Sequence, residues 1–140
     1  MPFRPFIKFY PDLALEEMRS FILADDHLGV PAGDYDLSEN YCDEPDCDCR
    51  KVMVNVITIA GNKPKIWATI GCGWENPSYY FQNFSDDVDL ARAMSGSYLE
   101  KLGEQSKYAS QFLEIWKNMI LDKVYEDRLK KHYQLFKNKL

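Results

Sequence analysis

The segment Val52–Trp74, VMVNVITIAGNKPKIWATIGCGW, carries the clearest β-strand pattern in the 140-residue chain. Two runs rich in β-branched residues flank the tetrapeptide GNKP, and such runs joined by a short turn of Gly, Asn and Pro are typical of an antiparallel hairpin. With Ala60 opposite Lys65, one face carries Met53 and Ile70, and the other face is also rather apolar. The pattern therefore predicts a sheet that is covered on both sides.

Directly upstream, the segment Tyr41–Val52, YCDEPDCDCRKV, holds three of the four cysteines within eight residues. Cys42, Cys47 and Cys49 form a C-x4-C-x-C array beside four acids and a proline, a composition that a hydrophobic core does not explain. Thiolates are ligands that zinc and other soft metals prefer, and tetrahedral zinc takes four N or S ligands. We therefore expect a zinc site on this loop, with the three cysteines as metal ligands.

Two residues compete for the fourth position. His27 lies on a turn-rich connector fifteen positions upstream of Cys42, where it is free to swing toward a metal. Cys72 would project from the hairpin face beside Met53 and Ile70, where a thiol usually serves as a small hydrophobe. His27 is the favoured fourth ligand, and Cys72, a water molecule or a carboxylate are the alternatives. With four protein ligands the ion has no open position, so hydrolytic zinc chemistry is not expected.

Arg50 follows the last cysteine of the loop directly. Three thiolates and an imidazole around zinc carry a net charge of −1, and the acids of the loop add more negative charge. We expect Arg50 to donate to a thiolate or to a neighbouring carboxylate; the alternative is that it only begins an exposed strand.

The same cysteines allow a second chemistry. The C-x-C spacing also occurs in redox proteins, so Cys47 and Cys49 could form the dithiol of a thiol enzyme. That interpretation leaves Cys42 and the acid-rich segment 43–46 unexplained, and another metal or a metal cluster is a further alternative. Beyond these thiols, the sequence shows no catalytic constellation.

The N-terminal third predicts an arm, a helix and a connector. Prolines at positions 2, 5 and 11 disfavour a helix within residues 1–10, so we expect an extended arm there. Pro11 and Asp12 open a helical pattern that we expect to end near residues 24–26. Tyr35–Tyr41 is expected to form a short edge strand or to stay irregular.

The C-terminal half is expected to be mainly helical. Residues 75–84 could form a third strand or an aromatic loop, and Ser85 would cap a helix that ends by Gly103. A helical pattern then runs over residues 106–138, and a slip in its phase between positions 124 and 129 indicates a bend or two consecutive helices. His132, on this last helix, is expected to face solvent.

Composition limits the class of function. The chain carries a net charge of −5, which disfavours a general DNA-binding surface. Residues 117–140 carry seven Lys or Arg against three acids, a net +4, so this end could contact an acidic partner or simply be a solvated helix face. No apolar run is long enough to span a bilayer, and residues 1–10 do not resemble a signal peptide, so we expect a cytoplasmic protein with reduced cysteines.

The loop that carries the cysteines resembles a group of uncharacterised prokaryotic proteins in which a Y-C-x-x-P-x-C-D-C-R core precedes a β-strand. The shared positions are Tyr41, Cys42, Pro45, Cys47, Asp48, Cys49 and Arg50, with an extension to His27, Pro31, Gly33 and Tyr35 upstream and to ATIGCGWE downstream. The resemblance covers about a third of the chain, implies a metal site without an established activity, and supports His27 over Cys72. The SEC-C type zinc motif differs, because it needs a downstream C-C or C-H pair that this chain lacks.

Together these patterns predict one α+β domain over residues 1–140. It would comprise an arm, helix and metal loop (1–50), a hairpin and aromatic segment (51–84) and a helical segment (85–140), with a small antiparallel sheet built on the hairpin. The expected function is a zinc-stabilised binding or adaptor module for a protein partner, with the basic, aromatic-bearing C-terminal helices as the candidate contact surface. A thiol redox enzyme and an RNA-binding module that stacks bases on exposed aromatics are the alternatives.

Overall fold

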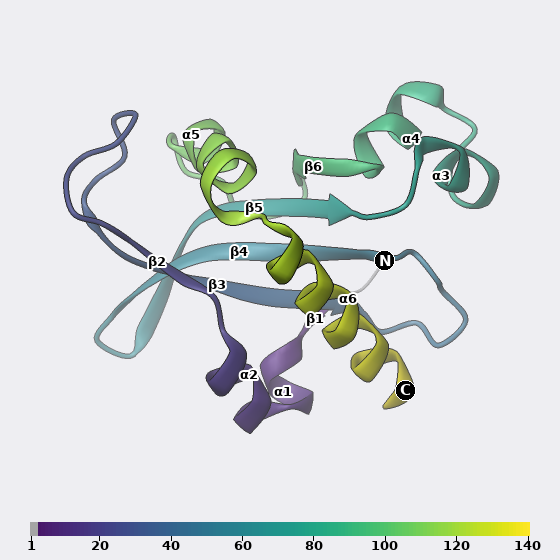
Figure 1. The fold of residues 1–140 in the computed structure, drawn as a ribbon, viewed down its shortest axis with the longest axis horizontal. Helices are drawn as coiled ribbons and strands as arrows, with labels where there is room; N and C mark the ends of the chain where they lie inside the picture. The colour runs from purple at the N-terminus through teal and green to yellow at the C-terminus, as the bar shows by residue number, and fades with distance from the viewer. Residues whose placement is uncertain (1–2) are drawn as a thin grey trace.

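The computed structural model describes residues 3–140 as an antiparallel sheet with helices against one face and at its edges (Figure 1). Along the sheet the strands lie in the order β1-β3-β4-β5-β6, and β2 also pairs with β3. The strands are β1 (Phe3–Pro5), β2 (Ser20–Leu23), β3 (Gly33–Cys42), β4 (Lys51–Ala60), β5 (Lys63–Gly73) and β6 (Gly96–Leu99). The predicted α+β class is confirmed.

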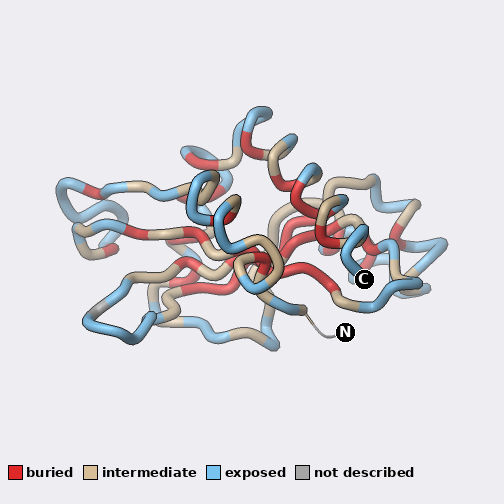
Figure 2. The backbone as a smooth tube through the Cα atoms, turned by 90° about the horizontal axis from the view of Figure 1, so that it is seen from below, coloured by how far each residue is buried: buried red, intermediate tan, exposed pale blue. Residues whose placement is uncertain are grey.

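The helices cluster before and after the central strands. Helix α6 crosses the sheet, while α3 and α4 lie together beyond the end of β5 (Figure 1). Buried residues are concentrated along the strands and recur on α6 (Figure 2). The helices are α1 (Phe6–Phe9), α2 (Pro11–Glu17), α3 (Pro77–Asn83), α4 (Val88–Met94), α5 (Ala109–Ile115), the π-helix η1 (Trp116–Ile120) and α6 (Lys123–Asn138).

The predicted hairpin is present as β4 and β5, but its predicted register is wrong. Ala60 pairs with Lys63 across a two-residue turn, and the register shifts between Val56 and Ile57. Near the turn the pairing differs from the predicted one by two residues, and beyond this irregularity it differs by one. A one-residue difference exchanges the faces on which paired side chains lie, because side chains alternate between the two faces of a strand. Ile70 and Cys72 consequently share a face with the buried valines at 52, 54 and 56, and Met53 lies on the opposite face.

Only one of these two faces is covered by α6. Glu39 pairs with Val54, and its carboxylate contacts His132 of α6, so the valine face is the one beneath the helix. On the opposite face, a hollow of about 260 Å³ lies between Met53, Asn55 and neighbouring residues. The expectation of a sheet covered on both sides is therefore met only in part, because Met53 and Asn55 on this face are half-buried while Thr69 and Lys51 are buried.

β3 is a long interior strand and not a short edge strand. It pairs with β4 on one side and with β1 and β2 on the other.

The predicted first helix ends early, at Glu17, because Phe21 joins β2 and stacks on Tyr35 with ring centroids 5.3 Å apart. The expected extended arm is confined to β1, since Phe6–Phe9 is helical between two prolines; residues 1–2 lie outside the described part.

Three predictions for the C-terminal half need correction. Asn76 caps a helix, α3, where a strand or loop was expected. Asp87, and not Ser85, caps the next helix, which ends at Met94 and is followed by β6. The structure shows consecutive helices, one of the two alternatives expected over residues 106–138, but the break lies earlier than expected. There the Asp122 carboxylate accepts from the Tyr125 amide and starts α6.

His132 is buried, so its predicted solvent exposure is wrong. Its Nδ1 lies 2.6 Å from Glu39 Oε1, and its Nε2 lies 2.8 Å from Glu17 Oε1. The imidazole also stacks on Phe6, with ring centroids 4.3 Å apart. Two carboxylates on distant segments therefore offset the cost of burying this ring, and the contacts hold α1 and α2 against α6.

Candidate metal centre

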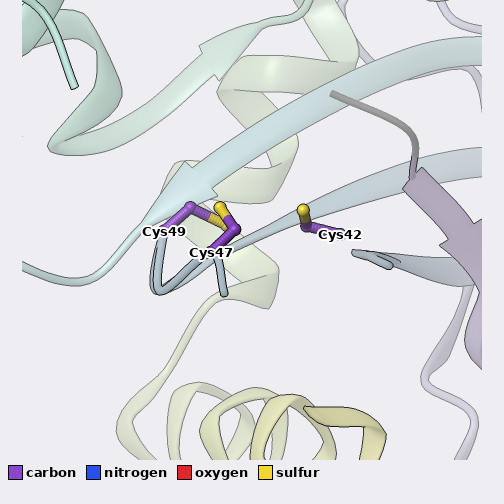
Figure 3. A group of neighbouring side chains, drawn as sticks. All are labelled: Cys42, Cys47 and Cys49. Atoms are coloured by element: carbon purple, nitrogen blue, oxygen red, sulfur yellow. The ribbon is translucent and has the colours of Figure 1, made fainter. Parts of the chain in front are cut away.

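The three cysteines of the loop meet in space. The Sγ atoms of Cys42, Cys47 and Cys49 all lie within 4.8 Å of one another, at the end of β3 and on the turn that leads to β4 (Figure 3). Two thiolates bonded to one zinc ion at ~2.3 Å with tetrahedral angles lie ~3.8 Å apart. Small side-chain adjustments would therefore allow one metal ion to contact all three sulfur atoms.

The acidic tetrapeptide turns the chain back toward β4. The Cys47 amide donates to the Glu44 carbonyl at 3.1 Å, which closes a turn with Pro45 in its second position, where the proline ring presets the backbone. Lys137, near the end of α6, donates to the carbonyls of Cys42 and Glu44, both at 3.0 Å. The first part of the loop is thus shaped by its own sequence and then held by a distant helix.

Asp48 and Arg50 form the second part of the loop. The Arg50 guanidinium donates twice to Asp48 Oδ2, from Nε at 3.0 Å and from Nη2 at 2.9 Å. The Arg50 hydrogen bond lowers the pKa of Asp48 and burial opposes it, so this carboxylate stays ionised. Of the two acceptors expected for Arg50, a thiolate or a neighbouring carboxylate, the structure shows the carboxylate.

Tyrosines from two other elements hold the backbone of this segment. The Tyr133 hydroxyl donates to Asp48 Oδ1 at 2.8 Å and accepts from the Arg50 amide at 3.2 Å. Tyr80 donates to the Arg50 carbonyl at 2.9 Å, and Tyr79 donates to the Asp48 carbonyl. Arg50 has a φ of +48°, which is unfavourable for a side chain with a Cβ, and these bonds stabilise it in that conformation.

Sequence reasoning missed these three tyrosines. The sequence pattern places Tyr79 and Tyr80 in an aromatic strand or loop and Tyr133 on the last helix, and it connects none of them with the metal loop. One feature of the sequence could have indicated their role. Asn76-Pro77 is a favourable start for a helix, and such a helix places Tyr79 and Tyr80 next to each other on one short element.

The structure does not bring His27 to the thiols. His27 pairs with Val30 in the turn between β2 and β3, next to the Gly33 end of β3. Cys42 lies at the other end of the same strand, which at about 3.3 Å per residue is about 30 Å away. For His27 to reach the metal loop, β2 would have to leave the sheet.

Cys72, the other candidate for the fourth position, is also outside the group. It pairs with Val52 on the face beneath α6, and its thiol accepts a hydrogen bond from Ser97 at 3.6 Å. It is buried, as expected of a cysteine that serves as a small hydrophobe. Within residues 3–140, no fourth His, Cys, Asp or Glu joins the three cysteines at the 4.8 Å distance.

Burial controls the protonation of the thiols. It raises the pKa of Cys49 to about 12, and the neighbouring Cys47 and Cys42 add to this effect. Burial and the adjacent Cys42 also raise the pKa of Cys47. Three adjacent thiolates are therefore unfavourable without a positive charge among them, and a bound divalent cation would supply that charge.

Comparisons with known proteins add no assignment. No family model, curated protein or solved structure matches the chain. No helix in the described part of the chain is both long and apolar enough to cross a membrane. The chemical character of the site consequently rests on the three thiols and their surroundings.

Proposed function

We propose that the protein binds a structural zinc ion through Cys42, Cys47 and Cys49. The convergence of the three Sγ atoms within 4.8 Å carries this proposal, because thiolates are favoured zinc ligands and no packing requirement gathers them on an acidic turn. The ion would tie the end of β3 to the turn before β4. Zinc binding would then contribute directly to folding, since the unfolded chain cannot hold the three sulfur atoms together.

The fourth ligand, in this proposal, is a water molecule or a carboxylate of the same loop. His27, the expected ligand, lies at the opposite end of β3, and Cys72 lies beneath α6. A single non-cysteine ligand is compatible with tetrahedral zinc. Three reduced thiols also require a reducing compartment, as the cytoplasm provides.

We infer that the zinc-bound loop presents a surface to a protein partner, which would make the protein a binding or adaptor module. A polar hollow of about 290 Å³ lies beside the loop, lined in part by Asp48, Arg50, Trp74 and Lys130. Trp74 and Arg50 are residue types that are enriched at protein interfaces. The geometry of the loop, and hence of this hollow, would depend on the ion.

The C-terminal helix α6, expected to be the partner-binding surface, is less suited to that role than the surface beside the metal loop. Its aromatic residues are buried against the sheet, and several of its basic side chains have internal partners. Lys137 binds loop carbonyls, and Arg128 donates to the Glu17 carbonyl at 3.0 Å. RNA binding would need exposed rings near these basic side chains, and the aromatic residues of α6 itself do not provide them.

Metal content of protein purified without chelator is the direct test. We expect one zinc ion per chain in the wild type, in His27→Ala and in Cys72→Ala, and loss of zinc in Cys47→Ser and Cys49→Ser. A wild type without metal, whose cysteines react freely with an alkylating agent, would overturn the proposal. That outcome would favour the thiol enzyme, although the raised pKa values of Cys47 and Cys49 are unlike those of a reactive thiol.

A further inference from the structure

A buried lysine without an acidic partner lies on the sheet face opposite α6. Lys51, the first residue of β4, is 6% exposed. Its Nζ donates to the Tyr98 hydroxyl at 2.6 Å and lies 5.6 Å from the centre of the Phe3 ring. Among residues 3–140, no carboxylate lies within 4.0 Å of this ammonium group.

Lys51 and Tyr98 together retain hydrogen-bond donors that are not used within this pair. A buried ammonium is unfavourable unless an opposite charge compensates it, and aromatic rings compensate it only in part. Lys51 uses one of its three N–H groups on Tyr98. Because the Tyr98 oxygen is the acceptor in that bond, the tyrosine keeps its own proton to donate. Two N–H groups and one O–H group therefore remain for an anionic ligand.

Two glycines of β5 allow neighbouring segments to approach the sheet closely beside this pair. Gly71 lies opposite Tyr98 in the sheet, and a Cβ built on Gly71 would lie 2.4 Å from the ring of Tyr98. The tyrosine ring thus lies directly on the backbone of Gly71. Gly73 lies opposite Lys51, and a Cβ there would lie 2.0 Å from the Met94 carbonyl oxygen. Gly71 thus lets the Tyr98 ring approach the sheet, and Gly73 lets the end of α4, which forms one wall of the hollow, approach it.

The donors open onto a hollow with apolar walls. The hollow, of about 590 Å³, lies between β6 and α4 and is lined by Lys51 and Tyr98. Leu90, Met94 and Leu99 contribute apolar surface, and Leu90 is 52% exposed. An exposed leucine beside a buried ammonium is suited to a ligand with an apolar chain and a charged end.

The charges around the hollow select the kind of anion. Asp87, Asp89 and Glu100 also line it, and one basic residue, Lys101, joins them. These acids oppose the binding of any anion, and the opposition grows with the number of charges on the ligand, so polyphosphates and nucleic acids are disfavoured more than a single carboxylate. A compact single charge that reaches Lys51 is the better fit.

We propose that Lys51 and Tyr98 bind the carboxylate of a small acid with an apolar chain, and that this chain lies along Leu90, Met94 and Leu99. Both Lys51 and Tyr98 donate to the carboxylate oxygens, and the ligand supplies the negative charge that the buried ammonium lacks. The proposal is independent of zinc binding, because none of these side chains belongs to the group of three cysteines.

Titration with octanoate, followed by amide chemical shifts and by calorimetry, tests the site. We expect saturable binding of octanoate, with perturbed signals around residues 51 and 98. Octanoate should bind at least tenfold more tightly than acetate, which lacks the apolar chain, and than 1-octanol, which lacks the charge. Equal affinity for octanoate and 1-octanol would contradict a role for Lys51.

Variants separate the contribution of each group. Lys51→Met should lower octanoate affinity at least tenfold, and Tyr98→Phe, which keeps the ring and loses the donor, should lower it several-fold. Lys65→Met is the matched control, because Lys65 lies over the Trp67 ring, outside the hollow, and its loss should leave the affinity unchanged. No octanoate binding by the wild type, or equal binding by Lys51→Met and Lys65→Met, would overturn the proposal.

A variant of an exposed residue tests the site without the risk that reduced binding reflects unfolding. Leu90→Ser removes apolar surface from an exposed wall residue without adding a charge, so the fold should be retained. It should lower octanoate affinity at least fivefold and leave acetate affinity unchanged. Zinc content, measured on each variant, should stay at the wild-type value, so that a failure of this proposal is distinct from a failure of the metal site.

Discussion

The two turns at the ends of β3 are built in opposite ways. The turn at its start closes with its own residues: His27 and Val30 pair through their backbones, and Leu28 and Gly29 between them both have positive φ. The loop at its end, from Cys42 to Arg50, depends on side chains from α3 and α6. A turn that needs distant partners is a better candidate for a functional site than one that needs none, since those contacts constrain its geometry.

Removal of the metal should have the largest effect of the changes considered, because it should destabilise the loop at the end of β3 and not the turn at its start. With free zinc a thousandfold above its dissociation constant, binding stabilises the folded chain by ~4 kcal/mol. A strong chelator should therefore lower the free energy of unfolding by about that amount, measured by urea denaturation. Cys72→Ala, which lies outside the cysteine group, should respond to the chelator as the wild type does. An unchanged unfolding curve in the chelator would contradict a structural ion.

Tyr133→Phe should weaken the metal loop without removing a ligand. The variant loses the hydrogen bonds to the Asp48 carboxylate and from the Arg50 amide. We expect a loss of ~1–3 kcal/mol in the free energy of unfolding, because one of these bonds involves a charged group. Zinc affinity, from competition with a coloured chelator, should also fall. Tyr108→Phe is the control, since the Tyr108 hydroxyl makes no hydrogen bond within residues 3–140, and it should change neither quantity.

The contact between His132 and Glu39, in the middle of β3, should make the free energy of unfolding depend on pH. Burial opposes its charge, but the hydrogen bonds and charges of Glu39 and Glu17 raise its pKa above the usual value. A raised pKa in the folded state means that the stabilisation is complete below about pH 6.5 and is lost as the pH rises through the folded-state pKa.

The test is a comparison of His132→Gln with the wild type. The stability advantage of the wild type should shrink by ~1.4 kcal/mol for each unit of pKa shift as the pH rises from 6 to 9. The difference between the two proteins isolates His132, because both have the same cysteines. A difference that stays constant over this range would show that His132 is not charged in the folded protein.

His27→Ala should produce the smallest effect, although His27 is the ligand that the sequence favours. Its turn closes through backbone contacts, which alanine can also make. We expect the free energy of unfolding to change by less than ~0.5 kcal/mol and zinc content to stay at the wild-type value. Loss of zinc in this variant would mean that β2 leaves the sheet to deliver the histidine, and would reverse the comparison of the two turns.

Several elements could be predicted because their signals are local. The hairpin of β4 and β5 follows from two β-branched runs and a Gly-Asn turn, and the start of α2 follows from Pro11 and Asp12. The length and interior position of β3 were not predicted, and Tyr35–Tyr41 was expected as a short edge strand or an irregular segment, because the sequence GDYDLSENYC is rich in polar residues. Those residues are accommodated by partners elsewhere, as where Tyr41 and His132 both contact Glu39. A local pattern does not contain such partners.

By itself the sequence determined the three thiols of the candidate metal site. Cysteines within eight residues, joined by a proline turn, cannot lie far apart, so Cys42, Cys47 and Cys49 meet by short-range geometry. Only the tertiary structure decided what lies around them. Ten residues of extended chain separate His27 from the site, while strand pairing and helix docking bring Tyr133 and Lys137 to it from more than eighty residues away. Spacing along the chain sets distance inside a turn, and the packing of sheet and helices sets it everywhere else.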